Sequence, residues 1–320
     1  MIIKTAEDRE SDLATLKGLL FRSDLTANIK QRIDQEIKNI QAGLKGEREA
    51  AYEMEFTYGL SKNWMLIHDL RFECEGKIAQ IDHIAISRLL EIWVCESKHF
   101  SEGLAINEHG ECSAFYNNKP YGVPSPFEQN RKHIAVLGSV FKTGLVKLPT
   151  RLGFTLNPSI KSLILVSKRA RISRPKTKIT GIDTIIKNDQ FKNKIDQYID
   201  ADNNLLGLAK LISSESLELF ARELGAIHRP IAINWHAKFG LPEMPTINQA
   251  SQQVKTYSQS TNSEQVVAER IDEVTTEKPK QKLICNSCNE PVPYAVAKFC
   301  WFNKPKFGGN LYCIECQKKV

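Results

Sequence analysis

The sequence predicts a mixed α/β domain followed by a small cysteine-rich module. Two amphipathic helical patterns occupy the first 45 residues, and after Gly59 the pattern changes to strand-like runs of aliphatic and aromatic residues. Five of the eight cysteines lie between residues 285 and 316. With 320 residues, of which 42% are hydrophobic and 25% charged, the chain can form one large domain or two smaller ones.

In the first half, helices are expected over residues 11–22 and 24–45, the second behind a cap at Ser23 or Asp24. The second helix has an aliphatic stripe at three- and four-residue spacing that indicates a packing face, formed by Leu25, Ile29, Ile33, Ile37, Ile40 and Leu44. Strands are expected after it, with long ones at residues 64–72, 78–87 and 89–98 and short ones at 104–106 and 112–116.

In the second half, a helix is expected after the segment YGVPSP, with Phe127, Ile134, Leu137 and Phe141 on one face. A buried strand at 162–167, a short strand near 184–186 and two helices reaching about residue 224 complete the domain. We therefore divide the chain by composition into N-terminal helices (1–42), the α/β domain with a helical extension (43–227), a flexible polar linker (228–282) and the cysteine-rich module (283–320).

Charge and targeting signals narrow the class of protein. Lys and Arg number 44 against 37 Asp and Glu, and the net charge of +7 suits a polyanionic partner such as nucleic acid. The first twenty residues have acidic side chains where a signal peptide would be basic and apolar, and no uncharged apolar run approaches ~18 residues. We expect a cytoplasmic protein without a membrane partner.

The segment LLEIWVCESK at residues 89–98 ends in two charges on one strand face. Alternation puts Leu90, Ile92, Val94, Glu96 and Lys98 on one side and Trp93 and Cys95 on the other. If the strands at 78–87 and 89–98 form a hairpin turning near Leu89, Asp82 lies opposite Glu96. Two such carboxylates repel unless a divalent cation lies between them, and their oxygen ligands suit magnesium or manganese. The alternative is a solvated ion pair at a strand end.

The residues 43–141 resemble the nuclease-related domain, known as NERD, a branch of the restriction-endonuclease-like PD-(D/E)XK group. Four motifs carry the resemblance in order: GLKGERE, QIDHIAIS, IWVCESKHFSEG and PFEQNRKHIAVL. The resemblance implies a restriction-endonuclease-like mixed sheet flanked by helices. It also implies a metal-dependent nuclease that hydrolyses phosphodiester bonds of nucleic acid. As the nucleic-acid partner we favour DNA over RNA, and the identity of the substrate stays open.

The same resemblance assigns roles to individual residues. Asp82 and Glu96 become the metal-binding carboxylates and Lys98 the catalytic lysine. Glu47 becomes an acid that joins the site from the preceding helix, although a charged helix face is an alternative for it. Gln129 matches a glutamine near the active site in related nucleases. We interpret His83 and His133 as structural or substrate-contacting residues, because a histidine beside an aliphatic run usually finds a local hydrogen bond.

The C-terminal module contains two CxxC pairs, Cys285 with Cys288 and Cys313 with Cys316, separated by 24 residues. Two such pairs predict a tetrahedral structural zinc site, and Cys300 between them is either an alternative ligand or a buried thiol. The segment resembles the zinc-ribbon-like tail of some NERD proteins. Its cations and aromatic residues suit either nucleic-acid binding or a small core: Lys298, Trp301, Phe302, Lys304, Lys306, Phe307, Tyr312, Lys318 and Lys319.

Together these features favour a metal-dependent nuclease with a zinc module that aids substrate binding. One alternative is a nucleic-acid-binding or regulatory protein that has a nuclease-like fold but does not cut. Another is an adaptor that docks a protein partner through the zinc module.

Overall fold

The computed structural model describes residues 1–201, 210–242 and 283–292, and then 296–297, 300, 304–308 and 310–317. The chain forms two compact units, Met1–Thr246 and Ile247–Val320, which are described separately below. None of the helices within the described residues has the length and apolarity that crossing a membrane requires.

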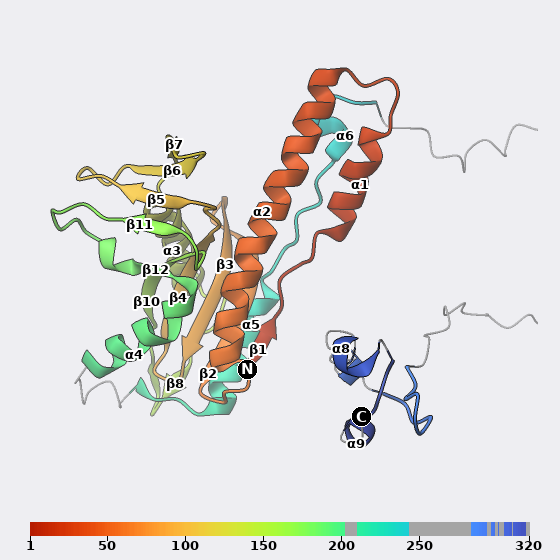
Figure 1. Ribbon diagram of the computed structural model, residues 1–320. Coiled ribbons are helices and arrows are strands. Elements are labelled where there is room, and N and C mark those ends of the chain that lie inside the picture. Colours follow the sequence, from red (N-terminus) through yellow and green to blue (C-terminus); the bar gives the residue numbers. More distant parts are fainter. Residues whose placement is uncertain are drawn as a thin grey trace, which may run out of the picture. The chain divides into compact units, whose positions relative to one another are not determined.

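A six-stranded mixed sheet forms the centre of the first unit (Figure 1). Strands β2, β3 and β4 pair antiparallel, while β1 pairs parallel to β2, β10 parallel to β4 and β12 parallel to β10. In sheet order the strands are β1 (Ile2–Lys4), β2 (Trp64–Cys74), β3 (Lys77–Ser87), β4 (Glu91–Lys98), β10 (Ser159–Val166) and β12 (Ile185–Lys187). The predicted mixed α/β class, with a sheet between helices, is confirmed.

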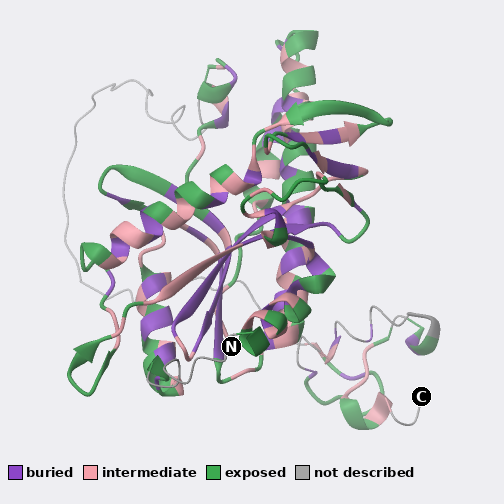
Figure 2. Cartoon of the chain, turned by 90° about the vertical axis from the view of Figure 1, so that its left-hand side faces the viewer, coloured by how far each residue is buried: buried purple, intermediate pink, exposed green. Residues whose placement is uncertain are grey.

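Helices cover both faces of this sheet because its strands are apolar on both sides. On one face, α2 (Ala27–Tyr58) and α4 (Phe191–Ala201) pack against Trp93 and Cys95. On the other face, α3 (Pro126–Lys142) and α5 (Ser214–Ala226) pack against Ile92 and Val94. Figure 2 shows the buried strands between helices whose outer surfaces are exposed. The predicted alternation of Ile92, Val94, Trp93 and Cys95 is therefore confirmed.

Strands that come after β4 in the chain form a second sheet. Its order is β11 (Arg171–Ser173), β5 (Gly103–Ile106), β6 (Cys112–Tyr116) and β7 (Lys119–Val123). Leu104, Ile106 and Cys112 from this sheet share a core with Ile164 and Val166 of β10. Other short elements of the first unit are β8 (Thr150–Arg151), β9 (Phe154–Thr155), η1 (Ile182–Thr184) and η2 (Asn188–Gln190).

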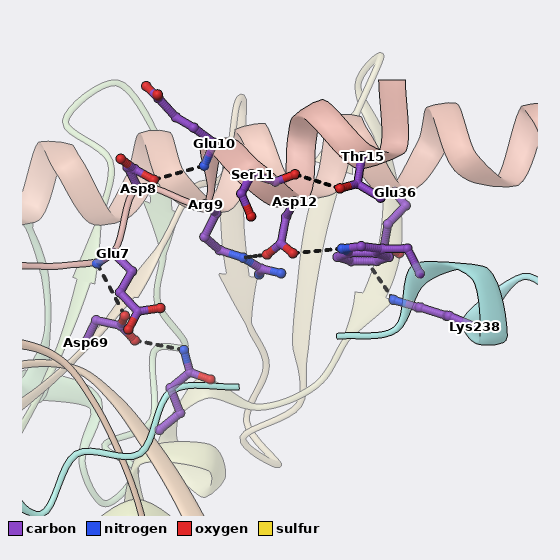
Figure 3. Close-up of polar contacts among 12 residues, drawn as sticks. Glu7, Asp8, Arg9, Glu10, Ser11, Asp12, Thr15, Glu36, Asp69 and Lys238 are labelled. Atoms are coloured by element: carbon purple, nitrogen blue, oxygen red, sulfur yellow. Dashed lines mark hydrogen bonds and ion pairs between the residues drawn. The ribbon is translucent and has the colours of Figure 1, made fainter. Parts of the chain in front are cut away.

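The N-terminal half of α2 extends beyond the sheet beside α1 (Glu10–Leu20) and α6 (Trp235–Lys238) (Figure 1). Leu16 of α1, Ile33 of α2 and Trp235 of α6 belong to one apolar cluster. Polar contacts tie the same elements (Figure 3): Trp235 Nε1 donates to Asp12 Oδ1 at 2.7 Å, and Lys238 Nζ donates to Glu36 Oε1 at 2.8 Å. We call this assembly of α1, the N-terminal half of α2 and α6 the helical arm.

The arm corrects two sequence-based expectations. The helix predicted over 24–45 runs as one element from Ala27 to Tyr58, and its cap is Thr26, whose hydroxyl accepts from the Ile29 N–H, in place of Ser23 or Asp24. It therefore crosses the boundary drawn at residue 42. Within the predicted linker, Trp235 and Phe239 are buried in the arm because their large apolar surfaces pack there. Residues 243–282 of that linker lie outside the described residues.

Candidate active site

The β3–β4 hairpin sets the predicted acids across from one another. His83 pairs with Cys95 and Ile84 with Val94, so continuing this register by one residue sets Asp82 opposite Glu96. On its other side β4 pairs with β10, where Ile164 faces Glu96 in the ladder. The two carboxylates therefore meet where the antiparallel pairing of β3 and β4 ends.

Glu96 has a carboxylate side chain, yet the residue is buried, with 1% of its surface exposed. Its Oε1 accepts from Lys98 Nζ at 2.6 Å, and the same ammonium donates to Gln129 Oε1 of α3 at 3.0 Å. Its Oε2 lies 3.4 Å from His133 Nδ1 and has no hydrogen-bond partner among the described residues. A buried carboxylate oxygen without such a partner is costly, so this position favours a cation or an ordered polar ligand.

Asp82 is half-buried beside this pair. Its Oδ2 accepts from both the N–H and the hydroxyl of Ser97, each at 2.8 Å. Burial raises the pKa of Asp82 well above its usual value, and the charges of Glu96 and Glu47 raise it further against the opposing Ser97 hydrogen bond and Lys98 charge. The charges of Glu96 and Glu47 thus act on Asp82, and additional positive charge at the site would favour the ionised form of Asp82.

A cavity of about 450 Å³ collects all five residues predicted for catalysis, which are Glu47, Asp82, Glu96, Lys98 and Gln129. Its wall also includes His133 and the segment of α2 around Gly43. Burial raises the pKa of Glu47, and the neighbouring charge of Asp69 adds to that rise. Glu47 therefore lines the cavity together with Asp82 and Glu96 and does not lie on an isolated charged helix face.

Gly46 allows α2 to come this close to the end of β4. A Cβ at Gly46 would lie 2.9 Å from His99 Cβ and 3.2 Å from the His99 backbone nitrogen. Both contacts are shorter than ordinary van der Waals separations, so a side chain here would push α2 away from β4. The second glycine of the GLKGERE motif, Gly46, thus sets the distance from which Glu47 reaches the cavity.

A backbone irregularity opposite Asp82 was not predicted. His68 pairs with His83 and Leu70 with Ile81, which leaves Asp69 opposite Asp82, and Asp69 has φ 54°. This left-handed conformation is uncommon for a residue other than glycine and is characteristic of functional or strained positions. Lys4 Nζ stabilises it by donating to the Asp69 carbonyl at 2.8 Å.

The irregularity also reverses, from one side of the break to the other, which face of the sheet the alternate side chains of β2 and β3 point to. Ile67 and Leu70 lie in the same core, as do Ile81 and Ile84, although residues three apart point to opposite faces of a regular strand. The three-residue spacing of these aliphatic side chains was the sequence signal for the break. Asp69 is held by Gln80 Nε2, which donates to Oδ1 at 2.9 Å (Figure 3).

The histidines are divided between two roles. His83 is fully buried, and its Nδ1 lies 2.8 Å from Nδ1 of the equally buried His68 across the β2–β3 pair. Burial lowers the pKa of His68 to about 4 and that of His83 well below its usual value, so this pair is neutral at pH 7. His133 instead contacts Glu96 in the cavity, where it can touch a bound ligand.

The second unit contains the predicted cysteine cluster. The Sγ atoms of Cys285, Cys288, Cys313 and Cys316 all lie within 4.8 Å of one another, and Cys288 Sγ is 3.6 Å from Cys313 Sγ. Four thiolates about 2.3 Å from a tetrahedral zinc would be about 3.8 Å apart, so this set fits zinc. In the described part of the chain, this is the only group of three or more histidine, cysteine or acidic residues gathered so closely.

Other features of this unit clarify Cys300 and the aromatic residues. Cys300 is buried outside the cluster, and its Sγ accepts from the Tyr312 N–H at 3.4 Å, which favours the buried-thiol interpretation. Phe307 is also buried, whereas Lys306 is exposed. The short helices are α8 (Lys304–Phe307) and α9 (Ile314–Gln317). Lys298, Phe299, Trp301, Phe302, Gly309, Lys318 and Lys319 lie outside the described residues, as does the side chain of Lys304.

Comparison with known proteins finds a family model that matches part of the chain. Residues 42–167 match the family model of the nuclease-related domain, NERD. The matched segment runs from the middle of α2 to the end of β10 and contains every acid and the lysine of the cavity described above. No curated protein and no solved structure matches the chain.

Proposed function

We propose that the nuclease-related domain at residues 42–167 is a divalent-metal-dependent nuclease that hydrolyses phosphodiester bonds of nucleic acid. The observation that carries this proposal is the buried Glu96 carboxylate, one oxygen of which lacks a hydrogen-bond partner among the described residues, beside Lys98 and Asp82. Acids and an ammonium around one open cavity are the groups that metal-assisted phosphodiester hydrolysis uses.

The donor set fits magnesium or manganese better than zinc. Asp82 and Glu96 would hold the ion, with Glu47 in reach of the same cavity. Magnesium commonly keeps several waters and takes only one or two protein carboxylates, so it does not need three acids gathered as closely as the cysteines are. Such an ion, when bound, supplies charge stabilisation at the phosphate and lowers the pKa of a coordinated water.

Two side chains of the protein hold the positively charged ammonium of Lys98 in place. Lys98 is held between Glu96 Oε1 and Gln129 Oε1, so its ammonium has a defined position in the cavity. From there it neutralises negative charge that develops on the phosphate or orients the attacking water. Gln129 is a positioning residue in this scheme, because its amide oxygen acts through Lys98.

We further propose that the four cysteines bind a structural zinc and that their module aids nucleic-acid binding. The cluster geometry and the exposed Lys306 support this assignment. Zinc supplies much of the folding free energy of so small a module. Deletion of residues 283–320 should weaken nucleic-acid binding and flatten its salt dependence if lysines of the module contact phosphates. Unchanged affinity and salt slope would instead favour the docking of a protein partner.

The decisive test is a cleavage assay with single- and double-stranded DNA and RNA in magnesium or manganese. Glu96→Gln should reduce cleavage at least about 100-fold, because it removes a metal-facing charge while preserving shape. Glu73→Gln, at an exposed position of β2 outside the cavity, is the matched control and should cut like the wild type. Wild-type cleavage by Glu96→Gln would refute the site. A wild-type protein that binds but never cuts would favour a non-catalytic nucleic-acid-binding protein.

A further inference from the structure

A second cavity adjoins the candidate active site. It measures about 450 Å³ and shares His99 with the first cavity, so the two cavities adjoin where the chain leaves β4. Its wall includes three exposed cations, Lys45 of α2 and the adjacent Lys168 and Arg169, against one carboxylate, Glu49. The excess of positive charge suits a phosphate chain that continues from the first cavity.

Two aromatic side chains lie exposed next to this second cavity. Tyr52 is 60% exposed and Phe56 is 80% exposed, and they follow one another by one turn along α2. Their rings are stacked, with centroids 6.2 Å apart and planes inclined by 26°. Large aromatic side chains are normally buried, so an exposed stacked pair offers apolar surface for a flat ligand.

Lys168 joins the aromatic pair to the cavity. Its Nζ lies 5.7 Å from the centre of the Tyr52 ring and forms an ion pair with Glu53 of α2. The same lysine lines the second cavity. Contacts and shared cavity walls thus connect Phe56 and Tyr52 through Lys168 and His99 to the candidate active site.

This alternation matches the chemistry of unpaired nucleotides. Bases stack on exposed aromatic rings only when their faces are free, whereas the backbone phosphates between them contact cations. A base pair within a duplex has its faces covered by its neighbours and cannot use Tyr52 or Phe56. The surface therefore distinguishes single strands from duplexes by the accessibility of the base.

We propose that Tyr52, Phe56, Lys168, Arg169 and Lys45 form a binding track for single-stranded nucleic acid, with bases on the aromatic pair and phosphates in the second cavity. The track leads the strand past His99 to the cavity of Glu96. This inference rests on the proposed nuclease function for its substrate class, but the track is tested by binding alone.

The test measures fluorescence anisotropy of labelled single-stranded oligonucleotides, DNA and RNA, and of the matching duplexes, with the full chain. Cleavage is prevented by omitting magnesium and manganese and by adding a chelator that is too weak to remove thiolate-bound zinc. The variants are Tyr52→Ala, Phe56→Ala and the double variant. Phe21→Ala is the matched control, since Phe21 is an exposed aromatic residue, 89% accessible, at the end of α1 and away from both cavities.

Single strands should bind more tightly than duplexes, and the double variant should weaken single-strand binding by about tenfold or more, the contribution of a stacked base. Phe21→Ala should bind like the wild type. Lys168→Gln should reduce the slope of log affinity against log salt concentration by about 0.7, the value for one phosphate contact with a single strand. All of these replaced side chains are exposed, so circular dichroism should show unchanged folding.

Equal affinity for single strands and duplexes would overturn the track. Wild-type affinity of the double variant for single strands would overturn it as well. So would a double variant that changes only the self-association of the chain, because a second copy of the chain would then be the occupant of this surface. The proposed function would be refuted by a different result. If the wild-type protein cleaves no substrate but still binds single strands more tightly than duplexes, the nuclease proposal is wrong and the track stands.

Discussion

Gly46 offers a direct test of how α2 is positioned over the candidate active site. Replacing it by alanine adds a Cβ that would lie 2.9 Å from His99 Cβ and 3.2 Å from the His99 backbone nitrogen. The second of these atoms belongs to the backbone after β4, so a side-chain rotation cannot relieve the contact. Either α2 or the end of β4 must move.

The expected magnitude follows from two opposing effects. Alanine is favoured over glycine inside a helix by about 0.8–1 kcal/mol, because glycine has more conformational freedom to lose. Overpacking a close contact costs about 1–3 kcal/mol. The free energy of unfolding of Gly46→Ala should therefore fall by up to about 2 kcal/mol, or at best remain unchanged.

Gly138→Ala is the matched control. Gly138 lies inside α3, and a Cβ there would have no heavy atom within 4 Å, so only the helical preference remains. Urea unfolding at pH 7 should show Gly138→Ala more stable than the wild type by about 0.8–1 kcal/mol, and Gly46→Ala less stable than this control by about 1–3 kcal/mol. Equal stabilisation by the two substitutions would refute the close approach. Cleavage by Gly46→Ala should also fall, since Glu47 moves with α2.

Four further outcomes are expected. Because burial lowers the pKa of His68 to about 4, the unfolded chain takes up a proton first as pH falls below 6.5, and urea unfolding should show a loss of about 3 kcal/mol between pH 6.5 and 4 from this residue. The pKa of Asp82 is raised in the folded state, so ionisation of this carboxyl destabilises the metal-free fold as pH rises from 3.8 through the folded pKa. Asp82→Asn removes this charge and should increase the melting temperature at pH 7, and a decrease would contradict this reasoning. Elemental analysis should find one zinc per chain, lost in Cys288→Ser but kept in Cys300→Ser, and equal loss in both would place Cys300 among the ligands. Trp235→Ala should loosen the helical arm by about 3–5 kcal/mol, seen as faster amide exchange in α1, while unchanged exchange would exclude this packing.

The sequence was sufficient wherever the relevant contacts are local. A hairpin register depends on a short turn and on alternation, so the positions of Asp82 and Glu96 followed from counting residues around Leu89. The faces of Ile92 and Trp93 followed in the same way. Two CxxC pairs likewise specify a thiolate cluster by spacing, because Cys285 and Cys288 flank one turn and Cys313 and Cys316 lie at the start of α9, so each pair brings two sulfur atoms close together.

Features that depend on distant segments were accessible only through the tertiary structure. Trp235 is buried against α1, more than 200 residues earlier in the chain, and no local pattern distinguishes that packing from a linker. The left-handed backbone of Asp69 is stabilised by Lys4, and Lys98 at the end of strand β4 is held by Gln129 of helix α3. Sequence patterns therefore predicted the strand register, the facing positions of Asp82 and Glu96, and the cysteine cluster. The distance of α2 from β4, the break opposite Asp82 and the neighbouring aromatic residues required the packed fold, because each depends on which surfaces come together in space.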